Sequence, residues 1–107
     1  MSDRKKPSIP FVSLHGHSTA GSINDALGYP DEHIDYGYNN GLLGMAFTEH
    51  GNCNSLSYAF MKSQKLKEQG ENFRVMFGIE AYVHPSIPLW KLEKEKHKQD
   101  AKLAKQV

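Results

Sequence analysis

Three short apolar stretches recur along the chain, and each ends abruptly in residues that can bind a metal ion or take part in catalysis. They cover about Ile9–Leu14, Leu42–Thr48 and Arg74–Glu80. Apolar runs of this length with polar ends are typical of strands covered on both faces, as in a parallel sheet. The recurrence therefore favours an α/β fold, provided that the intervening segments form helices.

Both connecting segments carry helix signals, and the first of them begins with a Gly- and Ser-rich stretch, 16–28, that is predicted to be a loop. Pro30 is followed by two acidic residues, which suits a first helical turn, and Asn40–Gly41 would end that helix. Over residues 55–69 four apolar side chains fit one helical face, and Gly70 follows as a cap glycine. These four residues are Leu56, Ala59, Phe60 and Leu66. The order strand, helix, strand, helix, strand predicts parallel βαβ units.

Length and composition limit the number of domains and the kinds of partner that the chain can have. The 107 residues suffice for one small domain, and a net charge of +1 gives no reason to expect a nucleic-acid or membrane surface. No stretch is long and apolar enough to cross a membrane, and Cys53 is the only cysteine, so we predict a cytoplasmic protein without membrane partners. Residues 1–8 are predicted to be a flexible lead-in, 9–84 the α/β domain, and 85–107 a charged, solvated helix or linker.

The polar residues at the strand ends form the candidate site. His15 and His17 are two apart, so they would point the same way from an extended strand. His50 and Glu80 end the next two strands, and the carboxyl ends of parallel strands meet at one edge of the sheet. Neutral imidazoles suit zinc, iron or manganese, and a carboxylate can bridge two ions.

Other residues invite a metal interpretation less strongly. Cys53 follows His50 by three residues, but a small thiol near a helix start is the simpler interpretation. We also expect His33, His84 and His97 to be surface residues. The scattered tyrosines lack an accompanying basic stripe, so we interpret them as core or rim residues rather than base-stacking platforms.

Three motifs in this order resemble the polymerase and histidinol phosphatase (PHP) family. They are His15-Gly16-His17, Thr48-Glu49-His50 and Gly78-Ile79-Glu80. The longer strings over residues 47–52 and 78–83 look most like the PHP domain of the bacterial-type replicative polymerase, the DNA polymerase III alpha subunit. The sequence departs from the family pattern in carrying Glu49 where aspartate is usual, and it lacks the later histidine motifs.

The resemblance implies a distorted seven-stranded (β/α) TIM-like barrel, of which this chain would supply the first three strands and two helices. It also implies a polynuclear metal site that holds two or three zinc or manganese ions in the complete domain. The ligands implied for this chain are His15, His17, Asp25, His50 and Glu80.

The implied activity is metal-dependent hydrolysis of phosphoesters in DNA replication, as a 3′-to-5′ exonuclease or in pyrophosphate removal. The remainder of the barrel or polymerase would be the partner, DNA would be reached through the complete protein, and the fragment alone is expected to be inactive. One alternative is a catalytically inactive PHP scaffold that docks polymerase partners. Another is a phosphoesterase of the histidinol phosphatase type.

Overall fold

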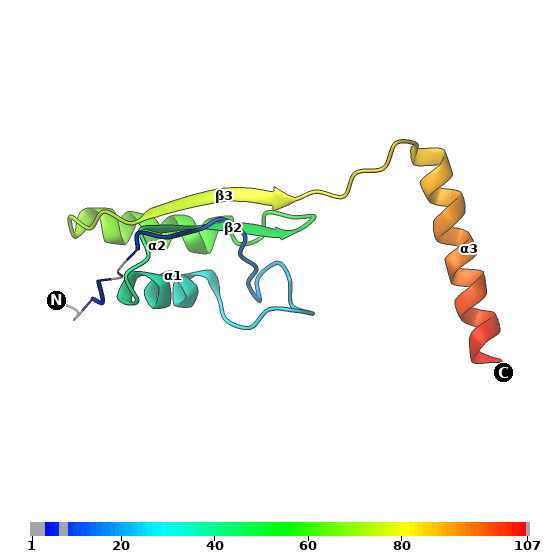
Figure 1. Cartoon of the computed structure of the whole chain (residues 1–107), viewed down its shortest axis with the longest axis horizontal. Helices are drawn as coiled ribbons and strands as arrows, with labels where there is room; N and C mark the ends of the chain where they lie inside the picture. The colour runs from blue at the N-terminus through cyan, green and yellow to red at the C-terminus, as the bar shows by residue number, and fades with distance from the viewer. Residues whose placement is uncertain (1–3, 7–8, 107) are drawn as a thin grey trace.

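The computed structural model describes residues 4–6 and 9–106, and these form a three-stranded parallel sheet and three helices (Figure 1). In chain order the elements are β1 (Val12–Ser13), α1 (Pro30–Asn39), β2 (Gly44–His50), α2 (Leu56–Glu68), β3 (Arg74–Glu80) and α3 (Ile87–Lys105). The strands lie in the order β1-β2-β3, and both pairs are parallel. The predicted alternation of strands and helices is therefore confirmed. It agrees with part of a (β/α) barrel, although three strands leave the sheet open.

The first strand is shorter than predicted. The sequence predicts Ile9–Leu14, whereas β1 contains only Val12–Ser13. The Gly16 N–H donates to the Thr48 side-chain hydroxyl over 3.2 Å instead of extending the backbone ladder. The Gly16 carbonyl still accepts from the Thr48 N–H over 2.7 Å, so the chain stays beside β2 after regular pairing ends.

The other strand boundaries follow from how the preceding helix ends. β2 begins and ends two residues later than the predicted Leu42–Thr48. The Leu42 N–H is already bonded to the Gly37 carbonyl, which closes the end of α1 and keeps Leu42 out of the sheet. β3 has its predicted bounds.

Both α1 and α2 end at a glycine in the left-handed conformation, as predicted. Gly41 has φ 87° and Gly70 has φ 79°. At the end of α2 the Gly70 N–H donates to the Lys67 carbonyl and the Glu71 N–H to the Leu66 carbonyl. This pair of bonds satisfies carbonyl groups that the last helical turn would otherwise leave without partners.

The core lies between the sheet and one pair of helices. α1 and α2 contact each other and both contact the sheet, so they cover the same face. The buried core residues are Ile34, Tyr38, Phe47, Ala59, Leu66 and Phe73. The face predicted for α2 is only half right, because Leu56 and Phe60 remain half exposed beside the buried Ala59. Side chains alternate along a strand, so His50 and Thr48 point away from the helices that Phe47 faces.

Part of the predicted lead-in is attached to the domain. The Arg4 side chain donates to the carbonyls of Tyr38 (2.8 Å) and Leu42, and it lies 4.4 Å above the centre of the Tyr38 ring. The Lys5 N–H donates to the Asn39 carbonyl over 2.9 Å. These contacts fasten residues 4–5 to the end of α1, although the composition of the segment gives no sign of them. The rest of the predicted lead-in, at 1–3 and 7–8, lies outside the described residues.

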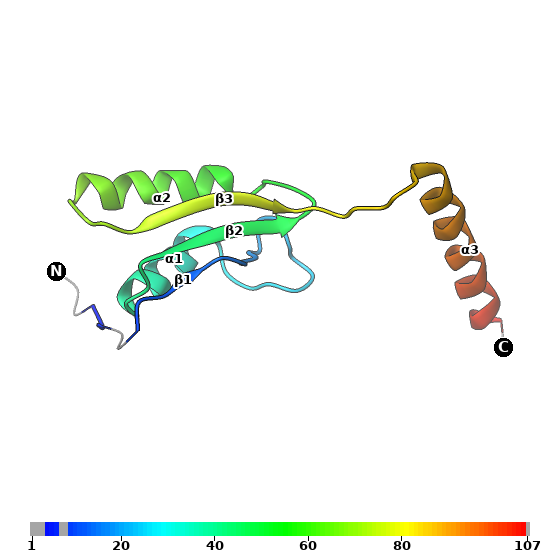
Figure 2. The ribbon, with the colours of Figure 1, turned by 45° about the horizontal axis from the view of Figure 1, so that its top comes forward.

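α3 stands apart from the sheet, beyond the carboxyl end of β3, in both views (Figures 1 and 2). Ser86 caps it by accepting from the Leu89 N–H over 3.3 Å, and all of its described side chains are at least partly exposed. The charged stretch is therefore a solvated helix, one of the two forms predicted. Within the described residues, α3 and the other helices are too short or too polar to span a membrane.

Candidate metal centre

The candidate site lies at the carboxyl edge of the sheet. His50 and Glu80 are the last residues of β2 and β3, and they are paired in register. The Gly51 N–H donates to the Glu80 carbonyl over 3.0 Å, which holds the two strand ends together just beyond the pair. His15 and His17 follow β1 at the same edge, in irregular backbone rather than in the extended conformation that their predicted common direction assumes.

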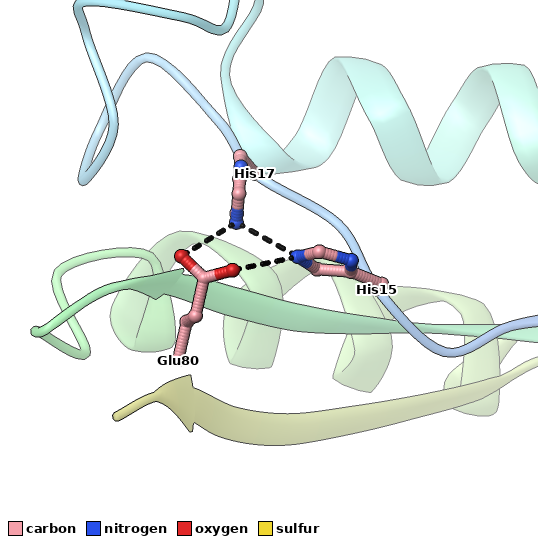
Figure 3. Close-up of side chains that lie close together, drawn as sticks. All are labelled: His15, His17 and Glu80. Atoms are coloured by element: carbon pink, nitrogen blue, oxygen red, sulfur yellow. Dashed lines mark hydrogen bonds and ion pairs between the residues drawn. The ribbon is translucent and has the colours of Figure 1, made fainter. Parts of the chain in front are cut away.

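A first cluster joins His15, His17 and Glu80 (Figure 3). The His15 Nε2 atom lies 3.2 Å from His17 Nε2 and 3.1 Å from Glu80 Oε1. The His17 Nε2 atom is also 3.7 Å from Glu80 Oε2. Two imidazoles and one carboxylate thus direct their donor atoms at a common point.

A second cluster joins His17, Asp25 and His50. The Asp25 Oδ2 atom lies 2.7 Å from His50 Nε2 and 3.7 Å from His17 Nδ1. His17 therefore belongs to both clusters and presents a different ring nitrogen to each. The His17 and His50 rings lie 4.1 Å apart, centre to centre.

The second carboxylate oxygen of Glu80 connects the two clusters. This oxygen lies against His50 Nδ1 and is 3.7 Å from His17 Nε2. Glu80, a member of the first cluster, therefore also contacts His50, a member of the second. This buried oxygen accepts no hydrogen bond from the described residues. All five predicted ligand residues lie within one connected group, and their role as ligands remains a prediction.

The donor set fits a divalent metal. Each donor atom in a cluster lies within 4.8 Å of the others, as required of groups that share one ion. Imidazole nitrogens suit zinc and carboxylate oxygens suit manganese, so a set of three imidazoles and two carboxylates fits either metal. Imidazole nitrogens that crowd a carboxylate oxygen without a hydrogen bond are also an arrangement that a shared cation would stabilise.

The electrostatic surroundings change the protonation of His50. Its hydrogen bond to Asp25 is the main cause that raises the pKa of His50 above its ordinary value of 6.5. The negative charges of Asp25, Glu80 and Glu49 add to this effect, while desolvation opposes it. Without a metal, this group of acidic residues therefore favours the protonated, positively charged imidazole.

Glu49, where the family usually has aspartate, holds the loop that carries two predicted ligands. Its side chain is 0% exposed, and its carboxylate accepts from the Ser18 N–H (2.6 Å) and the Ser22 hydroxyl (3.1 Å). The Ser22 oxygen in turn accepts from the His50 N–H over 3.2 Å. Ser18 directly follows His17, and Asp25 lies three residues beyond Ser22. The longer carboxylate thus joins the loop to the end of β2.

Gly21 leaves room for this arrangement. A Cβ atom at Gly21 would lie 2.3 Å from Glu49 Oε2 and 2.5 Å from Asn52 Oδ1. Asn52 also donates from its side chain to the Gly21 carbonyl over 2.8 Å. The loop therefore passes too close to β2 and its following turn for any larger residue at this position.

Tyr82 is a site residue that the sequence interpretation missed. The tyrosines were predicted to be core or rim residues; Tyr82 is 75% exposed, so it is not in the core, and its hydroxyl lies 2.8 Å from His50 Nδ1. The two rings are almost parallel, at 7°, with centres 6.3 Å apart. Tyr82 follows Glu80, the last residue of β3, by two residues. This position just beyond the strand could have indicated that Tyr82 lies at the site.

The remaining candidates lie outside the two clusters. Cys53 is exposed, and His84 pairs with Glu93 on α3 over 3.2 Å. His33 is not the surface residue predicted: it is half-buried and lines a cavity of about 220 Å³ that His17 also lines. The Nε2 atom of His33 has no hydrogen-bond partner among the described residues.

The parallel βαβ sheet and the histidine-rich cluster at its carboxyl edge define a class of protein: an α/β domain equipped to hold divalent metals. Comparison with protein families matches residues 13–106 to the PHP domain, so the chain belongs to the PHP domain family. No curated protein and no solved structure matched the chain.

Proposed function

We propose that this chain contributes ligands to a polynuclear metal site for phosphoester hydrolysis, as the N-terminal segment of a PHP domain in a DNA polymerase III alpha-like replicative polymerase. The carrying observation is the convergence of two donor clusters that share His17 and are connected by Glu80. One ion would be held by His15, His17 and Glu80, and His50 with Asp25 would hold another. Glu80 would bridge ions within the site.

The chemistry of the site would combine the metal and the chain. Bound zinc or manganese would lower the pKa of water and offset charge on phosphate oxygens. The imidazoles of His15, His17 and His50 act as ligands in their neutral form, so each must release any added proton before binding. Glu49 and Ser22 keep the loop of His17 and Asp25 against β2, which fixes the spacing of the donors.

The polymerase context rests on sequence strings. Phe-Thr-Glu-His-Gly-Asn at 47–52 and Gly-Ile-Glu-Ala-Tyr-Val at 78–83 look most like those of the polymerase branch of the family. In that context the partners are the remaining strands of the barrel, the polymerase and, through the complete protein, DNA. The cytoplasmic location is part of the same proposal.

The first test measures metal binding and its effect on stability. The purified chain is melted with and without zinc or manganese and compared with the double variant His15→Ala/His17→Ala. If the free metal concentration is about 100 times the dissociation constant, metal binding should raise the free energy of unfolding by about 2.7 kcal/mol. The double variant should lose this gain, since it removes two of three donors in one cluster and the shared donor of the other.

The matched control is His84→Ala/His97→Ala, which also removes two imidazoles but leaves both clusters intact. It should keep the full metal-dependent gain. Equal metal responses in all three proteins would contradict the site. Hydrolysis of a 3′-labelled DNA strand by the complete polymerase, and its loss in the same double variant, would separate an active domain from an inactive scaffold.

A further inference from the structure

A cavity of about 420 Å³ opens next to the second metal cluster. It is lined by the loop residues 21–25, by His50 and by Tyr82. Asp25 and His50 thus face the cavity as well as one another, so a phosphate held at the cluster would lie at the wall of this space. Whatever is attached to that phosphate can extend into the cavity.

The walls of the cavity suit a flat, partly apolar group. Tyr82 contributes an aromatic ring that is 75% exposed, and Ile23 contributes an aliphatic side chain that is 73% exposed. The Asn24 side chain adds an amide that can donate and accept hydrogen bonds. Exposed apolar side chains on two separate segments beside a charged cluster are typical of a binding site rather than of a solvated surface.

The Tyr82 ring is held in place before any ligand arrives. Its hydroxyl contacts His50 Nδ1 at 2.8 Å, and its plane is within 7° of the His50 ring. This contact restricts the ring while leaving most of its surface open. A ligand that stacks on Tyr82 would therefore lose less free energy in ordering the side chain.

We propose that this cavity binds the base of a nucleotide whose phosphate lies at the Asp25–His50 cluster, with the base stacked on Tyr82 and in contact with Ile23. This inference rests on the proposed function and adds to it a place for the base, which a phosphate ester without a base would leave empty. Stacking on an aromatic side chain tolerates any of the four bases, because every base has a flat apolar face. The cavity therefore recognises a nucleotide without reading its sequence.

The test compares two ligands that differ only in the base. Thymidine 5′-monophosphate and deoxyribose 5-phosphate are titrated calorimetrically into the full chain with manganese present. Base stacking on an aromatic side chain should make the nucleotide bind about 10- to 100-fold more tightly than the base-free sugar phosphate. Thymidine without phosphate should bind more weakly than the nucleotide.

Variants then show which residues are responsible for the preference for the nucleotide over the base-free sugar phosphate. Tyr82→Phe keeps the ring and should retain most of the preference, whereas Tyr82→Ala should bring the two dissociation constants close together. Ile23→Ala removes the aliphatic side chain from the cavity lining and should reduce the preference in part. Tyr36→Ala is the matched control, because Tyr36 is equally exposed, at 72%, but lies on α1 away from the cavity.

The outcomes separate the two proposals. Equal affinity for nucleotide and sugar phosphate would overturn the base site while leaving the metal-dependent phosphate site intact. A preference that survives Tyr82→Ala would also overturn it. If neither phosphate ligand binds in the presence of manganese, the base site is wrong, and the metal-dependent melting experiment decides separately whether the metal site of the proposed function is wrong.

Discussion

At the scale of residues, His17 is the shared member of the site. Its Nε2 atom faces His15 and Glu80, and its Nδ1 atom faces Asp25. Each nitrogen of a neutral imidazole can bind one ion only if it carries no proton. When metal ions occupy both clusters, His17 would bind an ion through one ring nitrogen and donate a hydrogen bond to a carboxylate from the other. The carboxylate that accepts this bond, Asp25 or Glu80, would then set the tautomer of His17.

Glu49→Asp tests the buried support of the loop. The shorter side chain cannot reach both the Ser18 N–H and the Ser22 hydroxyl, so one buried polar group loses its partner. We expect a loss of about 1–3 kcal/mol in the free energy of unfolding, measured with urea, together with weaker metal binding. Glu68→Asp, on the exposed surface of α2, is the control and should cost less than about 0.5 kcal/mol. An equal effect of both changes would contradict the assigned role.

The pH dependence of the metal-free chain tests the His50–Asp25 pair. The folded-state pKa of His50 is raised above its ordinary value of 6.5, so the pair stabilises the fold fully below that value. This contribution is lost as the pH rises through the raised pKa. Unfolding with urea in the presence of a chelator, from about pH 5 to about pH 9, should show that His50→Gln costs most at the acidic end.

Asp25→Asn provides the matched variant for this prediction, because Asp25 is the main cause of the raised pKa. In the Asp25→Asn background, His50→Gln should have a smaller and flatter effect across the same pH range. A cost of His50→Gln that grows with pH would show that the pairing does not stabilise the folded state.

The sequence predicted where the donor atoms gather but not what supports them. His50 and Glu80 end apolar strands, and parallel strands bring such ends together, so their proximity was foreseeable. Glu49 is adjacent to His50 in the chain but points to the opposite face, and its bonds depend on a loop whose path no local pattern specifies. The exposure of Tyr82 and the half-burial of His33 likewise depend on contacts between distant segments.

At the scale of elements, the helices were easier to predict than the first strand. Pro30 and the two cap glycines are local signals, and they placed the ends of α1 and α2 closely. The bounds of β1 depend instead on whether Thr48 uses its hydroxyl to bond the neighbouring segment. The apolar run over residues 9–14 contains no information about that choice.

Gly70→Ala tests the glycine that ends α2. Gly70 has φ 79°, and a Cβ atom there would meet nothing within 4 Å in the described part of the chain. The cost should therefore come from the backbone conformation alone, about 1–2 kcal/mol in the free energy of unfolding. Gly70→Asn should cost less, since asparagine tolerates this conformation better. Thermal unfolding that is unchanged by Gly70→Ala would contradict this account.

At the scale of the whole molecule, the sheet has exposed flanks. Within residues 4–6 and 9–106, β1 and β3 each pair with β2 only, and Phe77 and Ile79 of β3 remain about half exposed. α3 does not cover them, because it lies apart from the sheet. Unpaired strand edges and exposed apolar side chains of this kind are what further strands and helices would cover. They support the proposal that the remainder of a barrel is the partner of this chain.

The connection between His15 and Glu80 spans 65 residues of sequence. During synthesis at about 5–20 residues per second, the histidine pair therefore leaves the ribosome roughly 3–13 s before the glutamate that completes its cluster. In that interval the first cluster would lack its third donor, so the two histidines alone would bind an ion only weakly. Tight metal binding by this cluster would therefore begin only when β3 joins the sheet, so that the onset of metal binding would indicate that the sheet has formed.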